Sequence, residues 1–159
     1  MLKLFLKSVV IIFLLVVLLV GLGITGVYFY VWPTNFNDQN LNVTEITHRE
    51  LTKLIEEKKF YSEPSAFYFG APNEMVRIRA EVKVNLALNE IAEVVKKNPK
   101  KSAVLSSIKI SLKNFQDFDS EENEMVLYYF EKSLEILRIE SSNELFNVWR
   151  YGFPYGWFF

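Results

Sequence analysis

The stretch MVRIRAEVKVNLAL, residues 75–88, determines how the globular part of this chain is expected to fold. Its polar and charged residues, from Arg77 to Asn85, alternate with apolar ones. The apolar positions are Val76, Ile78, Ala80, Val82, Val84, Leu86 and Leu88. Because residues two apart share a face of a β-strand, this period of two predicts a long strand with one wet face. Such strands are typical of antiparallel sheets, so we expect an α+β domain.

Four further segments are candidate strands. LNVTEI, residues 41–46, is a possible short strand. AFYFG, residues 66–70, precedes the long strand and is its expected hairpin partner. Residues 108–113 alternate between apolar and polar side chains and predict a second amphipathic strand. Residues 125–140 fit a strand or a helix: their β-branched and aromatic side chains favour a strand, whereas the acidic residues before them favour a helix start. We expect a strand there and keep the helix as the alternative.

Helices are expected on either side of the long strand. Thr47 and Glu50 have the spacing of a capping box, which predicts a helix over 49–59. A short helix is predicted over 89–97, with Asn89 as its N-cap. The fold class that follows is α+β, with an antiparallel sheet and one or two helices.

The N-terminal part of the chain has a different composition. No residue from Ser8 to Asn37 is charged, and the residues from Val9 to Val31 are almost all aliphatic or aromatic. About 23 residues form a helix of about 35 Å, which exceeds the ~30 Å hydrocarbon core of a bilayer. We therefore predict a transmembrane signal-anchor helix at 9–32, after a short cytoplasmic N-terminus at 1–8.

A cleaved secretory signal is the alternative, with Lys3 and Lys7 as its basic region. The apolar run is about twice as long as that of a signal peptide, which favours an uncleaved anchor. Tyr28, Tyr30 and Trp32 then form an aromatic belt at the far membrane interface. Because the lysines precede the span and the first charges after it are acidic, we expect an extracytoplasmic domain, either periplasmic or extracellular.

Three regions are expected after the span: a linker at 33–41, the α+β domain at 42–148 and an aromatic tail at 149–159. The tail reads WRYGFPYGWFF, with a ring on every odd position. In an extended chain these rings share one face, which is too apolar to remain in water. We expect it to pack on its own domain, on a protein partner or in the membrane interface. The predicted partner-binding residues are Trp149, Arg150, Tyr151, Phe153, Tyr155, Trp157 and Phe159.

The residue types that most catalytic and metal sites require are scarce. The chain has no cysteine, and its single histidine, His48, lies where the predicted helix begins. The acidic run at 117–124 has Glu122 where a calcium-binding loop requires glycine, so a solvated acidic turn is expected. Three of the six glycines lie in the span, which leaves too few for a phosphate-binding loop. We therefore expect no enzymatic activity, no catalytic or metal-binding residues and no cofactor.

Four lysines surround Asn98 and Pro99 and predict a basic loop: Lys96, Lys97, Lys100 and Lys101. Such a loop either keeps the domain soluble or contacts anionic lipid or an acidic partner. Over the whole chain, 18 basic residues face 19 acidic ones, with a net charge of −1. This balance gives no support to a nucleic-acid partner.

These features lead to two functional hypotheses. The first is a non-enzymatic single-pass membrane protein, an accessory or structural subunit of a membrane or envelope complex. It would act through protein–protein contacts of its span, outward domain and aromatic tail, homo-oligomers included. The alternative is a membrane-anchored lipid or hydrophobic-ligand binding module. The expected order, a short strand at 41–46, the helix at 49–59 and the long strands, is similar to that of small membrane-anchored lipid-binding domains of the tubular type, and this resemblance implies an apolar groove.

Overall fold

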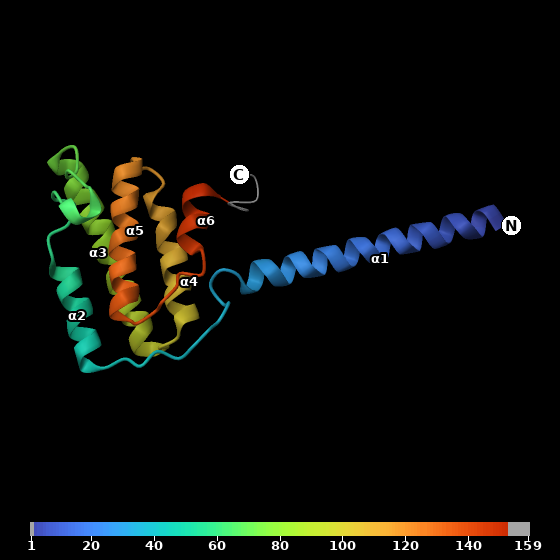
Figure 1. Ribbon diagram of the computed structural model, residues 1–159, viewed down its shortest axis with the longest axis horizontal. Helices are drawn as coiled ribbons and strands as arrows, with labels where there is room; N and C mark the ends of the chain where they lie inside the picture. Colours follow the sequence, from blue (N-terminus) through green and yellow to red (C-terminus); the bar gives the residue numbers. More distant parts are fainter. Residues whose placement is uncertain (1, 153–159) are drawn as a thin grey trace.

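The computed structural model describes the backbone of residues 2–152 and the side chains of residues 6–28 and 32–152. A long N-terminal helix projects away from a bundle formed by the other helices (Figure 1). The elements are α1 (Leu2–Val31), α2 (Glu45–Glu56), η1 (Pro64–Ala66), α3 (Glu74–Lys97), α4 (Lys101–Ser111), η2 (Leu112–Phe115), α5 (Ser120–Ile136) and α6 (Leu145–Tyr151). The part of the chain from α2 to α6 is thus a helical bundle.

The expected α+β class is wrong, because the described part of the chain contains no β-strand. Extended pairing there is limited to two isolated bridges, Asn40 with Lys100 and Glu63 with Tyr68. Without a sheet there is no groove between strands and a helix, so the similarity to tubular lipid-binding domains is not supported either. The error comes mainly from residues 75–88, which lie within α3.

The alternating residues of α3 form two separate faces. Ala80, Val84 and Leu88 are fully buried, whereas Val82 and Leu86 are more than half exposed. Residues two apart in a helix point about 200° away from each other, so alternate positions lie on opposite sides. A period of two therefore describes a helix with two apolar faces as well as it describes a strand.

The other expected strands are also absent. Residues 41–46 are an irregular segment followed by the start of α2. Residues 66–70 contain the end of η1 and an irregular loop, where Phe67 has a left-handed φ of 53°. Residues 108–113 belong to α4 and η2. Most of 125–140 lies in α5, so the helical alternative is correct. Its buried residues Val126, Phe130 and Leu134 recur every four positions, as one helix face requires.

The predicted helix starts are displaced. α2 is capped by Thr44, whose side chain accepts a hydrogen bond from the Thr47 backbone while the Thr47 side chain accepts one from the Thr44 backbone. The helix therefore begins before the predicted pair of Thr47 and Glu50. Residues 89–97 are the second half of α3, and Asn73 rather than Asn89 caps that helix.

A buried lysine closes the end of α2. The Lys59 side chain is fully buried, and its Nζ donates to the carbonyl oxygens of Leu54 at 2.5 Å, Ile55 at 3.1 Å and Glu57 at 2.8 Å. The last carbonyl oxygens of a helix have no N–H partner within the helix. The ammonium group of Lys59 donates to them instead. Burial lowers the pKa of Lys59.

Helix α1 differs from every helix of the bundle. Leu6–Tyr28 is an apolar stretch of 23 residues, and none of it is buried within the structure. The helix is therefore long and apolar enough to cross a membrane, a property that a signal sequence shares. It ends at Val31, before Pro33, whose ring does not continue a helix.

Candidate functional site at the junction of α1 and the bundle

Asn143 connects the residues that follow α1 to the helical bundle. Its side-chain nitrogen Nδ2 donates to the carbonyl oxygens of Pro33 at 2.8 Å and Phe36 at 2.6 Å. Its Oδ1 accepts a hydrogen bond from Lys101 Nζ at 2.8 Å. Asn143 has a φ of 53°, a conformation that asparagine adopts more readily than most residues. One buried amide thus ties the exit of α1 to the first turn of α4.

The same segment also pairs with the start of α4 through Asp38 and Gln39. The Lys101 backbone donates to the Gln39 carbonyl at 3.0 Å, and the Ser102 backbone donates to Asp38 Oδ1 at 2.8 Å. Burial alone would raise the pKa of Asp38, but the hydrogen bonds from Ser102 and Gln39 and the positive charge of Lys100 together outweigh it, so the pKa is lowered. The predicted linker at 33–41 is therefore held against the bundle by both its backbone and a side chain.

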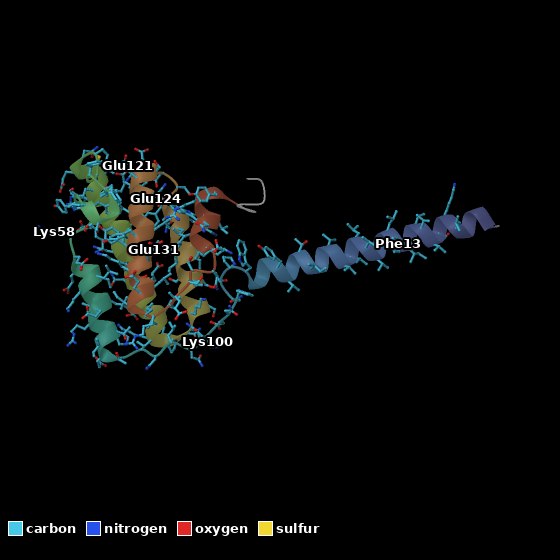
Figure 2. The ribbon with its side chains drawn as sticks, in the orientation of Figure 1. Phe13, Lys58, Lys100, Glu121, Glu124 and Glu131 are labelled. Carbon is cyan, nitrogen blue, oxygen red and sulfur yellow. The ribbon has the colours of Figure 1, made fainter. Side chains whose placement is uncertain are left out.

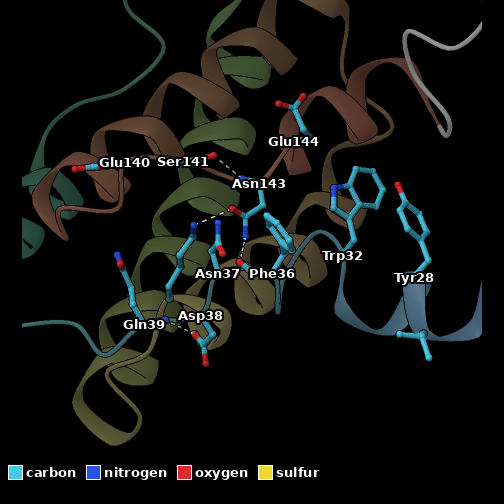
Figure 3. A pocket seen from close by; sticks show the side chains of 12 residues that line it. Tyr28, Trp32, Phe36, Asn37, Asp38, Gln39, Glu140, Ser141, Asn143 and Glu144 are labelled. Atoms are coloured by element: carbon cyan, nitrogen blue, oxygen red, sulfur yellow. Dashed lines mark hydrogen bonds between the residues drawn. The ribbon is translucent and has the colours of Figure 1, made fainter. Parts of the chain in front are cut away.

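An open pocket of about 960 Å³ lies at this junction (Figure 3). One wall comes from α1 and the chain just after it, and the rings of Tyr28 and Trp32 stack there with centroids 5.2 Å apart. These are two of the three predicted belt residues; the side chain of Tyr30 lies outside the described residues. The polar lining comes from Asn37, Asp38, Gln39, Lys101, Glu140, Ser141, Asn143 and Glu144.

The charges around the pocket are unequal. Lys101 contributes one ammonium group, against the carboxylates of Asp38, Glu140 and Glu144. The Lys101 side chain is buried, which lowers its pKa, although Asp38 and Glu140 act in the opposite direction. An ammonium group has three N–H donors, and Asn143 accepts one of them. The pocket therefore combines an acidic rim with a single cation that retains hydrogen-bonding capacity.

A second candidate site is the apolar side of α3 that the bundle does not cover. We call it the outer face of α3, and it comprises Met75, Ile78, Val82 and Leu86, which are 81%, 48%, 52% and 61% exposed. Phe67 and Phe69, in the loop just before α3 (Figure 1), are more than 90% exposed. Large apolar side chains that are exposed together on one helix face are characteristic of an interaction surface. The outer face of α3 therefore has the composition of an interface.

Residues 40–154 match the family model DUF4844, described as a domain of unknown function. The chain belongs to the DUF4844 family. The match begins after α1 and includes all helices from α2 to α6, so the DUF4844 domain is the helical bundle and the junction pocket lies at its border with α1. Comparisons with curated proteins and with solved structures found no match.

The lysines of the predicted basic loop have different roles in the DUF4844 domain. Lys96 and Lys97 are exposed in the last turn of α3, where positive charge favours the helix dipole. Lys100 is exposed at the surface (Figure 2), at the N-cap position of α4. Lys101 instead enters the junction pocket. In the sequence KKNPKK, residues 96–101, the four lysines look alike, so nothing there indicates that Lys101 would be buried.

The first residues of the predicted tail belong to helix α6 rather than to an extended segment. Trp149 packs against the core, whereas Tyr151 is exposed, because a helix points residues two apart in opposite directions. Arg150 donates from Nε and Nη2 to the two carboxylate oxygens of Glu124 on α5, at 2.7 Å and 2.6 Å (Figure 2 labels Glu124). The other predicted tail residues lie outside the described residues: Phe153, Tyr155, Trp157 and Phe159.

The acidic run at 117–124 forms the start of α5 in the DUF4844 domain. Asp119 occupies the N-cap position, and Glu122 is buried and accepts a hydrogen bond from the Tyr68 hydroxyl at 3.1 Å. Residues 2–152 contain no group of three or more His, Asp or Glu placed to hold a metal ion. His48 lies in the first turn of α2, as expected. Nothing in the sequence pattern indicated that Glu122 would be buried.

Proposed function

We propose that this protein is a non-enzymatic single-pass membrane protein whose DUF4844 domain docks onto another subunit of a membrane or envelope complex. In this proposal α1 remains in the bilayer, with Lys3 and Lys7 on the cytoplasmic side and the DUF4844 domain on the opposite side. The outer face of α3 is the observation that carries the proposal. Helix α1 supports the membrane location by its length and composition.

The shape of the outer face of α3 favours a helix as its partner. Its four residues are spaced by three or four positions over about three turns, which forms a continuous ridge. Ridges of this kind pack into the groove between side-chain rows of a second helix. Exposed apolar surface of this extent is characteristic of a protein contact, and the partner helix would present a complementary apolar stripe.

Residue chemistry supports a role without catalysis. The chain has no cysteine and one histidine. The most buried charged groups are engaged in holding the fold: Lys59 donates to the end of α2, and Glu122 accepts from Tyr68. General acid–base chemistry needs a titratable group that faces a substrate, and these two face helix carbonyls and a core hydroxyl.

Site-specific photo-crosslinking in native membranes tests the docking proposal. A photoreactive residue at Val82 or Leu86 is expected to give one discrete adduct with a second protein, whereas the same residue at exposed Lys109 on α4 is not. Ile78→Glu should abolish the adduct from Val82 while leaving the thermal unfolding of the protein unchanged, because Ile78 is exposed.

Two outcomes would contradict the proposal. An identical adduct pattern from Val82 and Lys109 would show that the outer face of α3 has no preferred partner. An adduct of twice the chain mass would assign this face to self-association instead of a second protein.

A further inference from the structure

We infer that the loop before α3 is a second docking element, in which Phe67 and Phe69 anchor a basic, partly apolar segment of another protein. We call residues 60–71, which contain η1, the aromatic loop. The inference goes beyond the proposed function, because it concerns a different surface from the outer face of α3. It also does not depend on a bilayer beside the domain.

The aromatic loop exposes two rings and buries the ring between them. Phe67 and Phe69 are 93% and 91% exposed. Tyr68 is buried, and its hydroxyl donates to the buried carboxylate of Glu122 at 3.1 Å. Phe60, at the start of the loop, is buried as well. Apolar rings normally leave water when the chain folds, so the exposure of this pair is a specific feature of the loop.

Hydrogen bonds hold the loop in this arrangement. The backbone N–H groups of Glu63 and Tyr68 each donate to the carbonyl oxygen of the other residue, at 2.9 Å and 3.1 Å. The Ala71 N–H donates to the Phe60 carbonyl at 3.1 Å. Phe67 lies between these bonds with a left-handed φ of 53°, which is unfavourable for a bulky side chain. The rings are therefore preorganised, and binding through them orders little additional chain.

The position of the aromatic loop favours a protein over the bilayer as its partner. The loop lies on the side of the bundle away from α1 (Figure 1). A bilayer that contains α1 would therefore lie on the opposite side of the domain. Phenylalanine, like tyrosine and tryptophan, is enriched in protein–protein interfaces relative to the rest of the surface.

A cleft beside Phe67 indicates the charge of that partner. The cleft has a volume of about 300 Å³ and lies between the aromatic loop, α5 and Arg150. Its acidic lining consists of Glu121, Glu124 and Glu131, which Figure 2 labels along α5. Arg150 occupies both carboxylate oxygens of Glu124. Among the described residues, Glu121 and Glu131 have no ion-pair partner.

These charges match an arginine or lysine side chain of the partner. The carboxylates of Glu121 and Glu131 attract the cation, and the face of Phe67 adds a cation–π contact. The same charges would repel an anionic lipid or an acidic segment. The partner segment therefore carries a basic residue that enters the cleft, next to apolar residues that pack on Phe69.

Selection from a random peptide phage library tests the inference. The target is the full-length protein in nanodiscs, and empty nanodiscs remove the peptides that bind lipid. We expect the selected peptides to combine Arg or Lys with Leu, Phe or Trp. A selected peptide is then synthesised with a fluorophore, and its affinity for each variant is measured by fluorescence polarisation.

The variants should weaken peptide binding to different extents. Phe67→Ser with Phe69→Ser is expected to weaken it at least about tenfold. Glu121→Gln with Glu131→Gln should weaken it about threefold at low salt and less at high salt. The matched control is Ile110→Ser, at an apolar position of α4 that is 63% exposed, and it should leave the affinity unchanged.

Four results would overturn the inference: no enrichment over empty nanodiscs, enrichment of acidic peptides, an unchanged affinity in the double phenylalanine variant, or an equal loss in Ile110→Ser. A photoreactive residue at Phe69 that crosslinks to lipid in native membranes would assign the loop to the bilayer and overturn it too. The substituted phenylalanines and glutamates are exposed, so an unchanged thermal unfolding midpoint verifies folding. Photo-crosslinking from Val82 does not involve the aromatic loop, so the two proposals can fail separately.

Discussion

Val82 and Val84 are two positions apart in α3, yet Val84 is fully buried and Val82 is 52% exposed. Residues two apart in a helix are rotated by about 200° around its axis. Val84 therefore faces the bundle, and Val82 lies on the outer face of α3. One helix therefore both stabilises the DUF4844 domain and presents an apolar surface to its surroundings.

Alanine at these two valines should have different costs. Val84→Ala is expected to lower the free energy of unfolding by about 2 kcal/mol, because it leaves a cavity in the core. Val82→Ala should change it by less than about 0.5 kcal/mol, because its methyl groups are already in water. Denaturant unfolding in detergent, followed by circular dichroism, measures both. Equal losses would contradict the two faces of α3, since a strand would bury both residues together.

Asn143→Ala should loosen the junction between α1 and the bundle. The change removes the acceptor of Lys101 and the donor to Pro33 and Phe36, which leaves buried polar groups without partners. We expect a loss of about 2–4 kcal/mol of unfolding free energy and faster proteolysis between residues 33 and 41. Gln116→Ala, at an exposed position, is the control and should change neither measurement appreciably. Unchanged proteolysis in Asn143→Ala would show that this amide does not hold the segment.

The stability of the domain should fall at alkaline pH because of Tyr129. Burial raises the pKa of Tyr129 to about 12, against a usual value of about 10 in an unfolded chain. Between these values the folded state keeps a proton that the unfolded state has lost. The stabilisation is therefore complete below pH ~10 and disappears as the pH rises through about 12. Burial raises the pKa of Tyr68 as well, so both hydroxyls act in the same direction.

Tyr129→Phe should flatten this alkaline loss, as measured by thermal unfolding from pH 8 to 12. It should also cost about 1–2 kcal/mol at neutral pH, because the Phe60 backbone N–H loses the Tyr129 hydroxyl, its acceptor at 3.1 Å. Tyr61→Phe, at a half-exposed ring, is the control. If the Tyr129→Phe variant lost stability with rising pH as steeply as the native protein, Tyr129 would not be the cause of the alkaline loss.

The ion pair of Arg150 and Glu124 should contribute little energy although its geometry is bidentate. Glu124 is more than half exposed, so water and salt screen the pair. A double-mutant cycle with Arg150→Met and Glu124→Gln is expected to give a coupling of about 0.5–1 kcal/mol that decreases in high salt. A coupling above about 2 kcal/mol, or one insensitive to salt, would show that α6 depends on this pair.

The long apolar helix α1 was predictable from the sequence and the bundle was not, for a physical reason. A long uncharged apolar run is expected to form one kind of structure, a helix long enough to cross a bilayer. Composition alone therefore indicates α1. Alternating apolar residues are compatible with two structures, a strand or a helix with two apolar faces. The continuation of α3 held the missing signal, because Ala87, Ile91 and Val95 break the period of two and extend the buried face at helical spacing.

The junction pocket could not be predicted at all. Its residues come from the end of α1, from the start of α4 and from residues 140–144, which only tertiary packing brings together. Lys101 differs from its neighbour Lys100 because its ammonium group donates a hydrogen bond to Asn143, which is 42 positions away in the sequence. The capping of α2 by Lys59 was missed for a related reason, since charged residues are normally assumed to face water.

The hydrogen bonds of Asn143 restrict the movement of α1 relative to the DUF4844 domain. Leu6–Tyr28 would span about 35 Å as a helix, somewhat more than a typical hydrocarbon core, and such helices tilt to fit. Because the exit segment is fastened, a change in tilt would carry the whole domain with it. Under the proposed arrangement, bilayer thickness would thus set the direction in which α3 presents its docking surface, and a thinner membrane would turn that surface toward a different neighbour.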